Sequence, residues 1–123
     1  MADYESVAKQ FTDFYYQTFG QNRAGLAGLY RPDSLLTFET TQTPGGEAII
    51  QKLVELPFQK MQHHVVTLNA QPSADGSIQV LVTGYIKLDE EPQPQTFAES
   101  FHLKPDGGSY YIAHDIFRLI FPP

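Results

Sequence analysis

Residues 78–89 read IQVLVTGYIKLD, and the alternation of apolar side chains along this stretch decides the fold. A period of two residues is typical of a β-strand, because successive side chains point to opposite faces of a sheet. One face would carry a nearly continuous aliphatic row, and the other face would still carry Leu81 and Tyr85. A strand that is apolar on both faces predicts a sheet that is covered on both sides.

Three further stretches show a similar alternation, over residues 63–70, 95–104 and 110–121. Turn residues such as aspartate, proline and glycine separate the four stretches. Consecutive antiparallel hairpins are therefore the simplest topology for the second half of the chain.

The last of these stretches, like the first, carries large apolar groups on both faces. Strict alternation places Ile112 and Ile116 on one face and Phe117 on the other. A domain of this size cannot cover both faces of its sheet alone, and two-fold dimers are the commonest closed assemblies. We therefore expect a homodimer that pairs sheet against sheet through Leu81, Tyr85 and Ile116.

The first half of the chain has helical periodicity. Apolar residues recur every three or four positions over residues 4–19, which predicts an amphipathic helix capped by Asp3. Shorter helices are expected over residues 23–30 and 49–54, the second stopped by Pro57. Helices followed by a meander of strands predict a single α+β domain over the 123 residues, with helices covering one face of a curved antiparallel sheet.

The charge composition limits the class of partner. Asp and Glu outnumber Lys and Arg by 14 to 8, and the basic residues are scattered, so neither nucleic acid nor an anionic membrane is an expected partner. The net charge of -6 favours basic or neutral partners. Without cysteine, disulfides and thiolate metal sites are excluded. We see no secretory or membrane-spanning segment and expect a soluble, uncleaved chain.

The four histidines and Asp115 are the candidates for a metal site or an acid–base pair. His63 precedes His64, and His114 precedes Asp115, but adjacent strand residues point to opposite faces. Neither pair can hold one ion without a bulge, and His102 has no such neighbour. Hydrolase nucleophile and zinc-helix motifs do not occur. We expect no metal, no cofactor and no catalytic residue.

The densest run of charge is acidic, at residues 89–91, although three carboxylates in a turn are usually only solvated. Another acid, Glu39, follows Phe38 at the end of a short expected strand, residues 35–39, where a pocket between helices and sheet would open. Acidic groups around an apolar pocket suit a partner segment with an aromatic side chain flanked by lysine or arginine. The residues favour a protein-binding site over a catalytic one.

At these residues the chain resembles the nuclear transport factor 2 family, and the resemblance covers nearly the whole length. It implies a cone-shaped fold, with a strongly curved sheet wrapped by three helices and dimerisation through the sheet. The motifs that carry it are FYY at 14–16, LLTFE at 35–39, LPFQKMQH at 56–63, DEEP at 89–92 and DIFRL at 115–119.

The resemblance implies a carrier that imports the small GTPase Ran, in its GDP form, into the nucleus. In the family, an aromatic side chain of Ran enters an apolar cavity, and neighbouring basic residues pair with groups at the cavity rim. The matching rim positions are Glu39, Asp89, Glu91 and His63. The side chains expected to line the cavity are Phe38, Leu56, Phe58, Met61 and Phe117.

The family also binds phenylalanine-glycine repeats of nucleoporins in a slot between two subunits. Tyr4, Gln42 and Gln71 match positions around that slot. Animal members typically carry tryptophan at the position of Tyr4, so we expect a fungal-type member. The resemblance places the protein in the cytoplasm and nucleus, enriched at the nuclear pore and envelope.

Two other hypotheses stay open on sequence grounds. The same cone fold hosts isomerases and dehydratases that act on small hydrophobic substrates, and His63 and Asp115 are the best candidates for a catalytic base. The chain would otherwise be a dimerisation module that binds neither Ran nor repeats.

Overall fold

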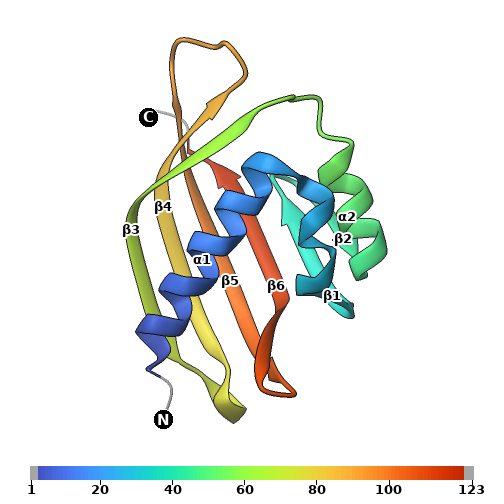
Figure 1. Cartoon of the computed structure of the whole chain (residues 1–123), viewed down its shortest axis with the longest axis vertical. Coiled ribbons are helices and arrows are strands. Elements are labelled where there is room, and N and C mark those ends of the chain that lie inside the picture. Colours follow the sequence, from blue (N-terminus) through green and yellow to red (C-terminus); the bar gives the residue numbers. More distant parts are fainter. Residues whose placement is uncertain (1–2, 121–123) are drawn as a thin grey trace.

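The computed structural model describes residues 3–120 of the chain. In chain order its elements are α1 (Tyr4–Gln21), the 3-10 helix η1 (Arg23–Leu29), β1 (Tyr30–Phe38), β2 (Thr41–Pro44), α2 (Gly46–Val54), β3 (Met61–Pro72), the short η2 (Ala74–Gly76), β4 (Ile78–Leu88), β5 (Gln95–Asp106) and β6 (Ser109–Leu119). Figure 1 shows α1 lying across one face of the sheet, with η1 and α2 packed together beside β1.

Helix α1 forms because its apolar residues share one face and its first turn is capped. The Asp3 side chain accepts a hydrogen bond from the Glu5 amide, as the sequence predicts. Ala8, Tyr15 and Phe19 are buried against the sheet. The helix continues one residue beyond Gly20 and ends at Gln21.

The strands form one sheet in the order β2-β1-β6-β5-β4-β3. Strands β3 to β6 are consecutive antiparallel hairpins, and the α+β fold is confirmed. The expectation of an all-antiparallel sheet was wrong, because β1 pairs in parallel with β6 and brings Phe38 opposite Phe117. A long connection through α2 and the meander returns the chain beside β1 in the same direction.

Two further boundaries differ from the expectation. Strand β1 begins at Tyr30, within the segment expected to be helical. The sequence analysis also did not predict strand β2, which runs into a Pro-Gly-Gly turn and pairs with β1 at the sheet edge. The predicted last strand extended to Phe121, which lies outside the described residues.

A bulge in β6 overturns the predicted alternation of that strand. His102 pairs with His114, but Leu103 pairs with Ile112, so Ala113 is an extra residue on β6. Ile112 is therefore fully buried in the core, and Ile116 is 52% exposed on the opposite face. The prediction that these two isoleucines share a face was wrong.

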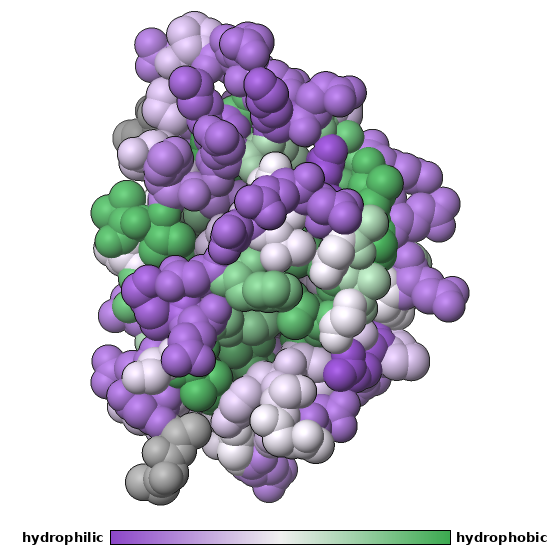
Figure 2. Space-filling model, in the orientation of Figure 1, coloured by the Kyte–Doolittle hydropathy of each residue, from purple (hydrophilic) through white to green (hydrophobic). Residues whose placement is uncertain are grey.

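The face of the sheet beneath α1 holds the core, and the opposite face is exposed. The core is rich in aromatic side chains, including Phe97 and Phe101 of β5. On the outward face Leu81, Tyr85 and Ile116 are 47%, 41% and 52% exposed. Figure 2 shows the side covered by α1, where hydrophilic residues surround a recess of apolar surface.

Candidate functional site

The expected rim and cavity residues gather at one end of the sheet, the upper end in Figure 1. Phe38, the last residue of β1, pairs with Phe117 of β6. Met61, the first residue of β3, pairs with Leu88 near the end of β4. Segments that are far apart in sequence therefore meet where the strands end.

Glu39 occupies a constrained position at this end. Its φ of 60° lies in the left-handed region, which is costly for a residue with a side chain. Its amide donates to the Phe117 carbonyl at 2.9 Å, and its carboxylate accepts from the Leu119 amide. Arg118 donates to the Glu39 carbonyl oxygen rather than to the carboxylate. No ion pair neutralises Glu39 within residues 3–120.

Asp89 is the second rim acid with left-handed backbone, at φ 46°. Its Oδ1 accepts from the amides of Gln59 and Lys60 at 2.9 and 2.8 Å, which fixes the loop before β3. Glu91 is exposed, and its amide donates to the Leu88 carbonyl in the turn after β4. Neither acid forms an ion pair in the described part of the chain.

The five expected cavity residues divide into two groups. Phe117 and Met61 are buried, so they belong to the core. Phe38, Leu56 and Phe58 are half-buried and cover that core at the rim, with the Phe38 ring stacked on Phe117 at 4.7 Å. These three side chains offer apolar surface to a partner.

Arg23 is a positioning residue that sequence reasoning missed. Its guanidinium donates to the Phe58 carbonyl at 2.6 Å and contacts the Met61 sulfur at 3.5 Å. It therefore ties the start of η1 to the loop that carries Phe58. An arginine directly after a helix end gives no sequence signal for this contact.

His63 points into the aromatic interior, whereas His64 is exposed on the other face, as expected. The imidazole ring of His63 packs against Tyr16, Phe19 and Phe97 at centroid distances of 4.6, 4.9 and 5.1 Å. Burial lowers the pKa of His63 to about 3. Its Nδ1 has no hydrogen-bond partner among residues 3–120. Because its pKa is lowered, the ring is neutral at physiological pH and contributes shape rather than charge to the rim.

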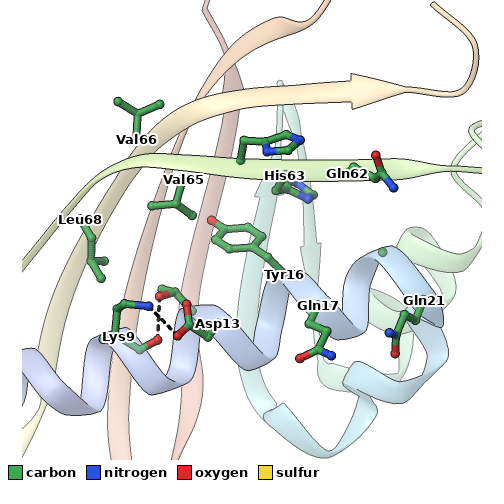
Figure 3. Close-up of a pocket in the computed structure, with 13 residues that line it drawn as sticks. Lys9, Asp13, Tyr16, Gln17, Gln21, Gln62, His63, Val65, Val66 and Leu68 are labelled. Atoms are coloured by element: carbon green, nitrogen blue, oxygen red, sulfur yellow. Dashed lines mark hydrogen bonds and ion pairs between the residues drawn. The ribbon is translucent and has the colours of Figure 1, made fainter.

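A groove between α1 and β3 opens beside His63, with a volume of about 720 Å³. Figure 3 shows Tyr16 and His63 together in the groove, with the ion pair of Lys9 and Asp13 on α1 and Val65 on β3. Polar side chains from α1 line much of it.

A buried acidic cluster lies below the aromatic layer, and the sequence analysis did not identify it. Asp115 Oδ2 accepts from the hydroxyls of Tyr30 and Tyr15 at 2.8 and 3.3 Å. Tyr16 donates to Glu99 at 2.9 Å, and Asp115 Oδ1 has no hydrogen-bond partner among residues 3–120. Burial raises the pKa of both carboxyl groups. Asp115, the candidate base, is thus a core residue held by tyrosines.

The three residues expected at a repeat-binding slot lie on separate elements. Tyr4 begins α1 and is 37% exposed. Gln42 lies in β2 and Gln71 in β3, at opposite edges of the sheet. Within one chain they do not form a single site.

The expected interface residues do lie together on the outward face. The register places Leu81, Ser100 and Ile116 in one row across β4, β5 and β6. Tyr85, four residues after Leu81 on β4, stacks on His64 with ring centroids 4.8 Å apart.

The part of the chain that the structure describes offers neither a metal site nor a membrane-spanning helix. Among residues 3–120 no group of three or more histidine, aspartate or glutamate side chains is arranged to hold a metal ion. None of the helices in this range is long and apolar enough to span a membrane.

Comparison with known proteins agrees with the fold and the motifs. Curated relatives named nuclear transport factor 2 are 58% identical in Emericella nidulans, covering 98% of each chain, and 52% identical in Saccharomyces cerevisiae, covering 95% of this chain and 94% of that one. The solved structure of nuclear transport factor 2 from Cryptosporidium parvum has a TM-score of 0.91 and 42% identity, covering 95% of this chain and 94% of that one.

Both curated relatives are named as transport factors rather than as enzymes, and both are fungal, which agrees with the resemblance to a fungal-type member of the family. The family described as the nuclear transport factor 2 (NTF2) domain matches residues 7–119. This chain belongs to the nuclear transport factor 2 family.

Proposed function

We propose that the protein carries GDP-bound Ran into the nucleus, and that it binds Ran at the end of the sheet where Glu39 and Asp89 lie. One observation carries this proposal: two acids and the half-buried rings of Phe38 and Phe58 lie at the same end of the sheet. Neither acid forms an ion pair within residues 3–120. Identity above 50% to curated transport factors supports it.

The chemistry of recognition follows from these groups. An aromatic side chain of Ran would pack against Phe38 and Phe58, because burial of a ring supplies most of the affinity at such hot spots. Basic residues beside that ring would pair with Glu39, Asp89 and Glu91, which speeds encounter and fixes orientation. The carrier selects the GDP form if Ran presents the ring only when the γ-phosphate is absent.

The second part of the proposal concerns the nuclear pore. Two chains pair through Leu81, Tyr85 and Ile116, and the repeat slot forms between the chains around Tyr4, Gln42 and Gln71. A phenylalanine of a nucleoporin repeat binds between them. Weak contacts of this kind let the loaded dimer move between cytoplasm and nucleus, with enrichment at the pore.

Binding of Ran to the purified protein tests the first part. We expect GDP-bound Ran to bind and Ran loaded with a non-hydrolysable GTP analogue to bind at least tenfold more weakly. Loss of one partner of a desolvated charge pair costs about 2–5 kcal/mol, so Glu39→Lys should weaken binding about thirtyfold or more. Isothermal titration calorimetry measures all of these affinities.

Two further variants make the result specific. Glu39→Gln removes the charge but keeps an oxygen that accepts from the Leu119 amide, so weaker binding by this variant reflects charge rather than damage to the strand end. Glu90→Lys changes the same charge at an exposed neighbour of the rim and should alter affinity less than threefold. Equal binding of both nucleotide forms would reject the selective carrier.

A further inference from the structure

The outward face of the sheet carries cationic and neutral side chains but no carboxylates over its central area. This area comprises the outward-facing residues of four strand segments, which are 62–71 of β3, 79–87 of β4, 96–104 of β5 and 114–118 of β6. None of the 14 acidic residues of the chain falls in it. Its basic and titratable members are Lys87, Lys104, Arg118, His64, His102 and His114.

Two of these histidines form a cross-strand pair at the centre of the face. His102 of β5 lies opposite His114 of β6, with ring centroids 5.6 Å apart at 88°. Each is two residues from the row that holds Leu81 and Ile116, so each points to the same face as that row. Any partner that covers Ile116 therefore also covers the histidine pair.

Among residues 3–120 no acid forms an ion pair with either histidine, and Asp33 on the neighbouring strand β1 accepts a hydrogen bond from the Tyr111 hydroxyl. Lys104 follows His102 on the same face of β5, and His64 lies on β3 at the edge. Asp75 lines a small pocket with His102 but forms no ion pair with it, and Asp106 at the hairpin end is paired with Arg31. Partial burial, His114 and Lys104 together lower the pKa of His102.

We propose that His102 and His114 make the pairing of this face with a second copy of the chain dependent on pH. The inference rests on the proposed dimer. In the dimer both imidazoles pack uncharged with their counterparts beside the apolar row. As the pH falls, the separate chains take up protons that the dimer must exclude, because pairing would bring several cations together without a carboxylate.

The expected size of the effect follows from proton linkage. Each proton that the separate chains bind and the dimer excludes lowers the association constant by up to about tenfold for each unit that the pH falls. One excluded proton on each chain, effective over about one of the two pH units between 7.5 and 5.5, thus raises the dimer dissociation constant about a hundredfold.

General electrostatics predicts the opposite direction. The chain has a net charge of -6 at pH 7, which decreases in magnitude as the pH falls. Repulsion between two copies should then decrease and association should become tighter. Weaker association at pH 5.5 is therefore a distinctive result.

The test is sedimentation velocity of the full chain over a range of concentrations at pH 7.5 and 5.5, at one ionic strength. We expect the wild-type dissociation constant to rise about a hundredfold at pH 5.5. The double variant His102→Gln/His114→Gln should dimerise at pH 7.5 and change less than threefold at pH 5.5. His64→Gln, a control on the same face, should keep the wild-type response. Near-ultraviolet circular dichroism checks that each chain is folded.

The outcomes separate the two proposals. A dimer of equal strength at both pH values, or a double variant that responds like the wild type, overturns the histidine mechanism and leaves the dimer in place. If the single variant His64→Gln loses the pH response of the dimer dissociation constant, the mechanism through His102 and His114 is also overturned. A monomer at pH 7.5 overturns the proposed dimer itself, together with this inference.

Discussion

Glu99 and Asp115 hold two carboxyl groups in the core with only tyrosine hydroxyls around them. They are 3% and 1% exposed, and no lysine or arginine pairs with either among residues 3–120. Burial raises the pKa of both carboxyl groups, and the charge of Asp115 raises that of Glu99 further. The folded chain therefore binds a proton that the unfolded chain releases above its ordinary pKa.

We predict that Glu99→Gln stabilises the protein at neutral pH. Glutamine keeps an oxygen that accepts from Tyr16 but has no group that ionises, so no proton has to be retained. Because the pKa is raised in the fold, wild-type stability is greatest below the ordinary carboxyl value of about 4 and decreases as pH rises toward the raised value. Urea unfolding should show a gain of about 1–3 kcal/mol at pH 7.5 and little gain at pH 4.5. An equal gain in the free energy of unfolding at both pH values would contradict a proton retained in the fold.

His63 gives a second prediction at this scale. Its pKa of about 3 results from burial among aromatic rings, with His64 adding repulsion. Its imidazole resonances in NMR spectra should therefore stay constant between pH 8 and 5. A titration midpoint inside that range would show that the ring is hydrated and that the rim is more open than described.

Among the elements, β3 and β4 depend on one glycine. The register of β3 shifts between Val65 and Thr67, and a Cβ on the opposing Gly84 would lie 2.0 Å from the His64 carbonyl oxygen. Because both atoms belong to the backbone, a side chain there requires the bulge to open.

We predict that Gly84→Ala lowers the free energy of unfolding by about 3 kcal/mol, as overpacking of a rigid site does. Gly28→Ala is the matched control, because a Cβ there meets no atom within 4 Å. Chemical denaturation should find the control within about 0.5 kcal/mol of the wild type. Similar stabilities for the two variants would mean that the bulge adapts freely.

The alternation of apolar residues predicts where the strands lie but not how they pair. Alternation identifies the meander, but it carries no information on strand direction, so the parallel pairing of β1 with β6 could not be seen. Alternation also does not reveal that Ala113 is an extra residue in β6, which places Ile112 on the opposite face from the one predicted. The acids at Glu39 and Asp89 followed from the family motifs, whereas Glu99 was missed although it stands at a core position between Phe97 and Phe101.

At the scale of the whole molecule, the distribution of charge supports both proposed interactions. All 14 acidic residues lie outside the central outward face of the sheet. Pairing of two such faces would leave the rim acids Glu39, Asp89 and Glu91 of each chain outside the contact. A basic partner would then be attracted to each rim without interference from the dimer contact.

We predict that Ile116→Asp makes the protein monomeric while it still binds GDP-bound Ran. A carboxylate at this 52% exposed position would be buried without a partner on pairing, at a cost of several kcal/mol. Val54→Asp, at a similarly exposed apolar residue of α2, should remain dimeric in light scattering. Because the proposed repeat slot needs two chains, the monomer should lose binding to immobilised phenylalanine-glycine repeats while Ran affinity changes less than threefold. Loss of both activities, or of neither, would contradict the separation of the two sites.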